Sequence, residues 1–169
     1  MAACVWAMPS HAHAASFTPK DLQVLGRAVA FMVPPPATES FIAIVHAPGN
    51  AASRQDAEAI AVLIGGGLRA GGSVLRPKIM DTSSAAAGGF AVVIAATGAA
   101  AGASGAQLNA SVRAARALCV TTEIEAVRAG LCAMAITSAP RVEIVLNHAA
   151  AAAAGIGFAA AFRMMIREI

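Results

Sequence analysis

The sequence contains no tyrosine and one tryptophan, and it has few charges for its 169 residues. Twelve lysines and arginines stand against nine acidic residues, which gives a formal net charge of +3. The basic residues are scattered, and no aromatic residues are interleaved with them. Proteins that capture nucleic acid need a dense basic surface and, for single strands, stacking side chains. We therefore do not expect a nucleic-acid partner.

Long hydrophobic runs are also missing. The longest, Ala149 to Phe162, is rich in alanine and glycine, and it is shorter than the ~20 apolar residues needed to cross ~30 Å of hydrocarbon. The apolar fraction is nevertheless 58%, and a chain of this length buries roughly 70% of its unfolded surface. We expect a soluble protein in which residues 15–169 form one domain with a core of small side chains.

Residues 1–14 resemble the end of a secretory signal peptide. Ala2 to Met8 is apolar, and Ala12-His13-Ala14 has the small-x-small form of a cleavage site. No lysine or arginine precedes Lys20, so the basic start of a signal is missing. Either the true start lies upstream, or this is an ordinary N-terminus. We expect export to the periplasm, with a mature chain that begins near Ala15.

Helices and buried strands alternate along the rest of the chain. A helix capped by Thr18 should start at Pro19, with Asp21 near the positive end of its dipole, and end before Pro34 to Pro36. Strands are expected at residues 41–46, 73–80, 90–96, 118–122, 130–136 and 141–146, and further helices at 54–68, 107–117 and 123–128. This order predicts an α/β fold, a mainly parallel sheet flanked by helices with an antiparallel terminal hairpin.

Several residues have an expected structural role. Ser53 and Asp56 form a candidate capping pair for the helix at 54–68, and Pro77 indicates that the strand at 73–80 lies at a sheet edge. Asn147 is expected to cap a long C-terminal helix that packs on the sheet. The spacing of its apolar residues predicts one apolar stripe, with charges at its exposed end: Ile156, Phe158, Phe162, Met165 and Ile166, then Arg163, Arg167 and Glu168.

The carboxyl ends of the parallel strands supply the candidate ligand site. Such sheets commonly bind ligands in the crevice at that edge. The residues expected there are small and polar: Gly49, Asn50, Ser53, Thr97, Gly98, Thr121 and Thr122. They suit contacts with a small molecule or a partner, and the simpler alternative is that they form turns and helix caps. The three-glycine dinucleotide fingerprint is absent from this loop.

Catalytic and metal-binding patterns do not stand out. His46 and His148 could act as bases, but packing roles are commoner for such residues, and the loop serines lack a nucleophile-elbow context. Glu123 and Glu125 are expected to form a solvated helix face. His11 and His13 would leave with the signal segment. We expect no enzymatic activity, no cofactor and no metal.

Residues 21–169 resemble the YfiR/HmsC-like family. The resemblance rests on Phe31-Met32-Val33-Pro34 after a helix, and on the strand Arg141 to Leu146 that ends in Asn147 and leads through Ala149-Ala150 into a terminal helix. The sequence departs from the family at Val33, where an aromatic residue is frequent, and at 130–132, which lacks the usual double glycine. Members are small exported α/β proteins, and the best understood are periplasmic negative regulators of a membrane diguanylate cyclase.

The resemblance implies a regulatory function. We expect an exported, non-catalytic protein that relays a periplasmic signal to a membrane-bound partner, a diguanylate cyclase or a histidine kinase, and so acts in cyclic-di-GMP or related signalling. A homodimer and a small-molecule ligand are compatible with this function. The alternative from another class is a small periplasmic solute-binding protein that serves a transporter.

Three cysteines remain to be explained. Cys4 would be removed with the signal, which leaves Cys119 and Cys132 on neighbouring expected strands. In an oxidising compartment such a pair tends to form a disulfide, and the resembled family uses disulfides, sometimes near this region. The alternative is two buried thiols that act as small apolar residues. Two cysteines without a suitably spaced histidine do not make a metal site.

Overall fold

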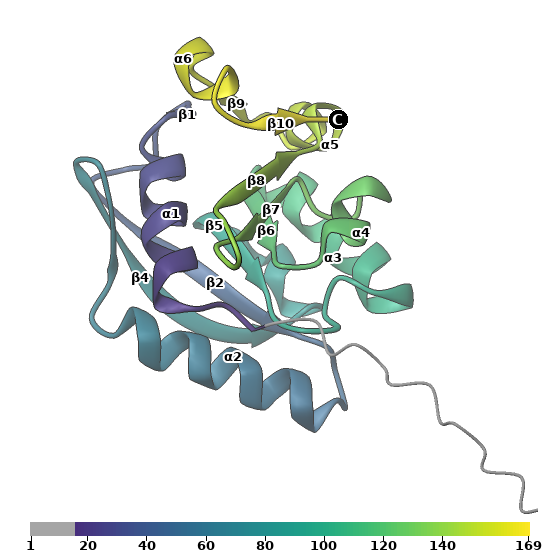
Figure 1. The fold of residues 1–169 in the computed structure, drawn as a ribbon. Coiled ribbons are helices and arrows are strands. Elements are labelled where there is room, and N and C mark those ends of the chain that lie inside the picture. The colour runs from purple at the N-terminus through teal and green to yellow at the C-terminus, as the bar shows by residue number, and fades with distance from the viewer. Residues whose placement is uncertain (1–15) are drawn as a thin grey trace, which may run out of the picture.

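The computed structural model describes residues 16–169, so the expected signal segment, with Cys4, His11 and His13, lies outside the described residues. The chain forms an eight-stranded sheet in the order β10-β8-β7-β6-β5-β2-β4-β3, and a separate pair of short strands, β1 and β9 (Figure 1). The strands are β1 Met32–Val33, β2 Glu39–His46, β3 Leu68–Ala70, β4 Ser73–Asp81, β5 Phe90–Ala95, β6 Leu118–Thr121, β7 Met134–Thr137, β8 Glu143–Leu146, β9 Gly157–Phe158 and β10 Arg167–Glu168. The helices are α1 Pro19–Val29, α2 Ala51–Ile64, the 3-10 helix η1 Ser84–Ala87, α3 Gly102–Ala115, α4 Ile124–Arg128, α5 His148–Ala153 and α6 Ala160–Arg163.

The centre of the sheet is parallel, which confirms the expected α/β fold. β4, β2, β5, β6 and β7 pair in parallel, whereas β8 pairs antiparallel with β7 and forms the predicted terminal hairpin. β2 is buried on both faces, since Ile42 to Val45 are completely inaccessible to solvent. A central parallel strand needs such a run of apolar residues because helices cover both sides of it.

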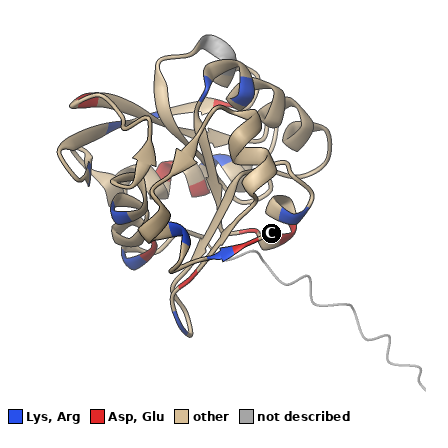
Figure 2. Ribbon diagram, turned by 90° about the horizontal axis from the view of Figure 1, so that it is seen from above, with Lys and Arg blue, Asp and Glu red and all other residues tan. Residues whose placement is uncertain are grey.

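Helices cover both faces of the sheet. Leu25 of α1, Ile60 of α2 and Ala151 of α5 belong to the apolar cluster on one face, while Leu108 of α3 and Val127 of α4 belong to the cluster on the other. Figure 1 shows α1 and α2 on one side of the strands and α3 and α4 on the other. Charged residues of both signs are distributed around the resulting surface (Figure 2). Among residues 16–169, no helix is both long and apolar enough to cross a membrane.

Two of the helix caps are the residues predicted from the sequence, and a third is a different residue. Thr18 caps α1 as expected, and Asp21 completes a capping box with it that was not predicted. Asn147 caps α5 by accepting a hydrogen bond from the Ala150 amide. The expected Ser53–Asp56 capping pair is wrong. α2 begins three residues earlier than expected, and Asn50 caps it by accepting a bond from the Ser53 amide at 3.1 Å. The side chains of Ser53 and Asp56 are free for other contacts.

The expected C-terminal packing helix does follow Asn147, but its predicted length is wrong. α5 ends at Ala153, and Gly155 then takes a left-handed conformation with φ +71°, which glycine adopts without steric cost. The chain continues as β9, which pairs with β1, and as β10, which adds to β8 in parallel. Of the expected apolar stripe, Phe158 therefore lies in β9 and Phe162 in α6, and the other three residues lie in the connections.

The expected edge position is confirmed at Pro77 itself, although β3 is the outermost strand of the sheet and covers the start of β4. β4 pairs with β2 along its whole length, but β3 covers only Ser73 to Leu75. The amide of Val74 bonds to the carbonyl of Thr38, so alternate residues of β4 face β2 and Pro77 faces the open side. A proline there removes no hydrogen bond from the sheet.

Candidate ligand-binding crevice

The seven residues predicted for the ligand site do gather along one edge of the sheet. Gly49, Asn50 and Ser53 lie between β2 and the first turn of α2, and Thr97 and Gly98 follow β5. Thr121 ends β6, and Thr122 comes next. Because β2, β5 and β6 are neighbours in the sheet and run parallel, their three loops meet at the same edge.

Two carboxylates connect these loops. Asp56 of α2 accepts hydrogen bonds from the amide and the hydroxyl of Thr97, at 2.7 and 2.9 Å. Glu123, just before α4, accepts the amide of Gly98 at 2.7 Å, while its own amide donates to the Thr121 hydroxyl at 3.1 Å. The edge is therefore held together by charge-assisted hydrogen bonds, which are stronger than neutral ones.

Neither carboxylate was among the residues predicted for the site. The sequence predicts a helix cap for Asp56 and a solvated face for Glu123, and both predictions are wrong. Their positions offered a signal, because each lies at or near the start of a helix that follows a parallel strand, at the edge where the loops of neighbouring strands meet. Glu125 does lie on the solvated face, where it pairs with Arg128 at 2.7 Å.

Ser53 and Thr121 face inward. Each side chain belongs to a residue with 1% of its surface exposed. The Ser53 hydroxyl accepts the amide of Ala47 at 3.0 Å, which closes the loop between β2 and α2. These two hydroxyls hold the backbone, so the surface available to a ligand comes from their neighbours.

A pocket of about 280 Å³ opens at the start of α2. It is lined by His46, Gly49, Asn50, Ala51 and Arg54. The first amides of a helix have no intrahelical acceptor, and they attract anions and carbonyl oxygens. The ring Nδ1 of His46 lies 3.4 Å from the Ala47 carbonyl oxygen, and Arg54 pairs with Glu58 at 3.1 Å. The pocket is thus lined by polar side chains and by one arginine that is paired with Glu58, and Gly49 and Asn50 are the members of the predicted set that line it.

A disulfide joins Cys119 of β6 to Cys132, just before β7. Their Cα atoms are 5.0 Å apart, and each residue is 1% exposed. This confirms the predicted bond and excludes the alternative of two free thiols. The bond encloses α4 and the segment that carries Thr121 and Glu123, so it stabilises the part of the edge contributed by β6.

Within residues 16–169, no three histidine, cysteine, aspartate or glutamate side chains gather as a metal site would require. No protein-family model matches the chain, and no curated protein matches it.

Proposed function

We propose that this chain is a periplasmic regulatory protein, which binds a membrane-bound signalling partner, a diguanylate cyclase or a histidine kinase, without catalysing a reaction. The Cys119–Cys132 disulfide is the observation that carries the proposal. Structural disulfides persist in oxidising compartments such as the periplasm and are rare in the cytosol of mesophiles. The resemblance of residues 21–169 to the YfiR/HmsC-like family supports the partner class.

The crevice is the contact surface in this proposal. Its loops are fixed by Asp56, Glu123 and the disulfide, so binding there orders little additional backbone. A site whose backbone is already ordered loses little conformational entropy on binding, and this favours affinity. Asn50 and Ala51 are exposed at the rim of the pocket, where they can contact a partner or a ligand that controls it.

Site-specific photo-crosslinking tests the proposal. A photoreactive amino acid at Ala51 should crosslink a cyclase or kinase in membranes of the native host, identified by mass spectrometry. The matched control is Val62, which is 81% exposed on the same helix but does not line the pocket. Equal crosslinking at the two positions, or only cytosolic targets, would contradict the proposal.

The pocket also favours a second candidate function, solute binding for a transporter. Its His46 and Arg54 lining suits a small anionic solute. Here the crosslinks at Ala51 should identify a permease. A small molecule extracted from the purified protein should then be lost on substituting Arg54→Gln, with the fold intact.

A further inference from the structure

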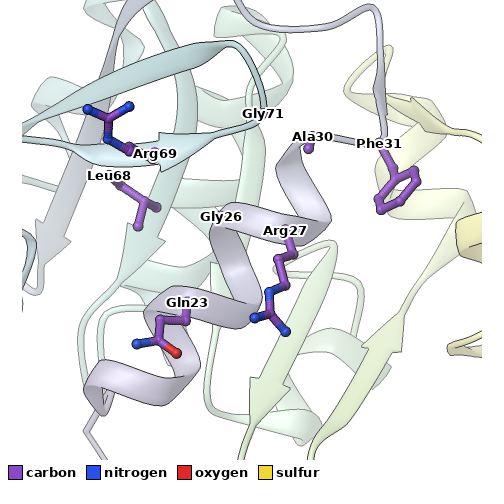
Figure 3. A pocket seen from close by; sticks show the side chains of 8 residues that line it. All are labelled: Gln23, Gly26, Arg27, Ala30, Phe31, Leu68, Arg69 and Gly71. Carbon is purple, nitrogen blue, oxygen red and sulfur yellow. The ribbon is translucent and has the colours of Figure 1, made fainter.

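A second and larger pocket lies away from the crevice, between α1 and β3 (Figure 3). Its volume is about 500 Å³, which is within the ~300–1,000 Å³ range of small-molecule sites. We call it the α1–β3 groove. Its lining residues are Gln23, Gly26, Arg27, Ala30, Phe31, Leu68, Arg69 and Gly71.

Glycines bring the two walls of the groove together. A Cβ at Gly26 would collide with the carbonyl oxygen of Arg69, and a Cβ at Gly71 would lie 3.1 Å from the Cβ of Ala30. The backbone of α1 therefore packs directly on the hairpin of β3 and β4. The surface left beside this contact is apolar, with Leu68 and Ala30 along it.

The charge on the walls is positive. Arg27 stands on α1 and Arg69 on β3, both are exposed, and no acidic residue lines the groove. Among residues 16–169, neither guanidinium has a hydrogen bond or an ion pair, whereas Arg54, Arg128 and Arg163 each pair with a glutamate. Unpaired arginines beside an apolar surface complement an anion that has an apolar body.

An aromatic side chain stands at one end of the groove. Phe31 is 37% exposed, and its ring stacks on Phe162 with the centroids 5.4 Å apart. The stacking holds the ring in place, while its exposed part remains available for a flat apolar group. Gln23 and Arg27 lie four residues apart on α1 and thus on the same helix face.

We propose that the α1–β3 groove binds a small organic anion with a flat apolar body. The body packs on Leu68, Ala30 and Phe31, and the acidic group pairs with Arg27. Figure 3 shows the side chains of Arg27 and Arg69 extending from opposite walls without pointing toward one another. Arg69 therefore contributes positive charge from the facing wall, and Arg27 is the direct partner.

Two probes with the same ring system test the proposal in the full chain. 8-Anilinonaphthalene-1-sulfonate carries the acidic group, and N-phenyl-1-naphthylamine lacks it. In fluorescence titrations the sulfonate should bind more tightly than the neutral compound. Arg27→Gln should weaken sulfonate binding by at least about tenfold, as expected for a lost charged hydrogen bond, and Arg69→Gln should weaken it less. Binding of the neutral probe should change little.

Arg113→Gln is the matched control, because Arg113 is an exposed arginine of α3 that does not line the groove. It removes the same charge and should leave both affinities unchanged. If Arg113→Gln and Arg27→Gln weakened sulfonate binding equally, the effect would come from net charge alone. That result would overturn the proposal. So would equal affinities of the two probes for the wild-type protein.

A second pair of variants locates the probe. Ala30→Leu places a larger side chain in the groove and should weaken both probes. Gln23→Glu puts a carboxylate one turn from Arg27 and should weaken the sulfonate alone. Thermal unfolding confirms that each variant folds. Unchanged binding in both variants would place the probe elsewhere and overturn the proposal. Arg54→Gln changes the crevice pocket alone and should leave groove binding of both probes unchanged, whereas weaker sulfonate binding in this variant would place the probe in the crevice and overturn the proposal.

Discussion

The carboxylate of Asp56 accepts both the amide and the hydroxyl of Thr97, at 2.7 and 2.9 Å. This contact joins the first half of α2 to the loop after β5, 41 residues further along the chain. The other carboxylate oxygen accepts the hydroxyl of Ser16. One acidic side chain therefore fixes the N-terminal segment, α2 and the crevice edge relative to one another.

Asp56→Ala should destabilise the protein by about 1–3 kcal/mol, because the partly buried amide of Thr97 loses its acceptor. Urea unfolding measures the change. Glu58→Ala is the control, since Glu58 is an exposed residue of the same helix that pairs with Arg54. Its effect should be within about 0.5 kcal/mol. A similar loss in both variants would contradict the role given to Asp56.

Ser53→Ala and Asn50→Ala should differ in mechanism. Asn50→Ala removes the cap of α2 and should cost about 1 kcal/mol, and Asn50→Asp should restore it. Ser53→Ala leaves the buried amide of Ala47 without an acceptor, which should cost about 1–3 kcal/mol. Capping residues other than serine at position 53 should not restore the lost stability fully. Chemical denaturation of the four proteins checks the order.

The local pattern at this loop could predict a helix start but not its exact residue. Asn50 and Ser53 are both good capping residues, three positions apart. The choice depends on the amide of Ala47, which turns inward and takes the Ser53 hydroxyl as its acceptor. That is a tertiary contact, and a capping rule does not contain it. The strands were easier to predict, because runs such as Ile42 to Val45 are buried on both faces.

The C-terminal segment shows the same limit more clearly. Its apolar residues have helical spacing, yet the helix α5 stops before Gly155. The conformation of the residues after Gly155 is set by contacts with distant parts of the chain. Phe162 packs between Phe31 and Phe158, with ring centroids 5.4 and 5.1 Å away. A contact with a residue 131 positions earlier produces no periodic pattern in the local sequence, so that pattern cannot predict it. The α1–β3 groove was missed for the same reason.

Phe162→Ala should therefore release the tail. The ring is 4% exposed, and its loss should cost up to about 3–5 kcal/mol if the site does not collapse. Hydrogen exchange should show lost protection at residues 157–169 before the central strands are affected. The neighbouring Met164 is 88% exposed, so Met164→Ala should leave exchange and stability unchanged. Equal protection of the tail in both variants would contradict this packing role.

Acid should weaken the turn that begins η1. Hydrogen bonds from the Ser83 hydroxyl, then from Ser84, hold the pKa of Asp81 below its ordinary value of 3.8. A carboxylate with a depressed pKa in the folded state stabilises the protein above the unfolded value and loses that contribution as the pH falls through the folded value. Carboxyl-carbon NMR should show Asp81 titrating below pH 3.8. In Ser83→Ala the pKa should rise, and an unchanged titration would contradict the assignment.

Reduction of the Cys119–Cys132 disulfide should destabilise the protein substantially. The cysteines are 13 residues apart, and chain entropy predicts about 3 kcal/mol for closing a loop of that size. For a chain this long, that corresponds to a fall in Tm of about 6–12 °C. Both cysteines are buried, so the reductant should act only after partial opening, and pre-incubation is needed before the measurement.

The double variant Cys119→Ser, Cys132→Ser separates the bond from the reagent. It should melt at the temperature of the reduced wild type or lower, since each buried sulfur is replaced by a polar hydroxyl, and it should not respond to reductant. Because the bond encloses Thr121 and Glu123, its loss should also loosen the loop that holds the Gly98 amide. Hydrogen exchange at Gly98 should then increase, while the β2–β4 pairing keeps its protection. Two alkylatable thiols in protein purified under oxidising conditions would show that the bond does not form.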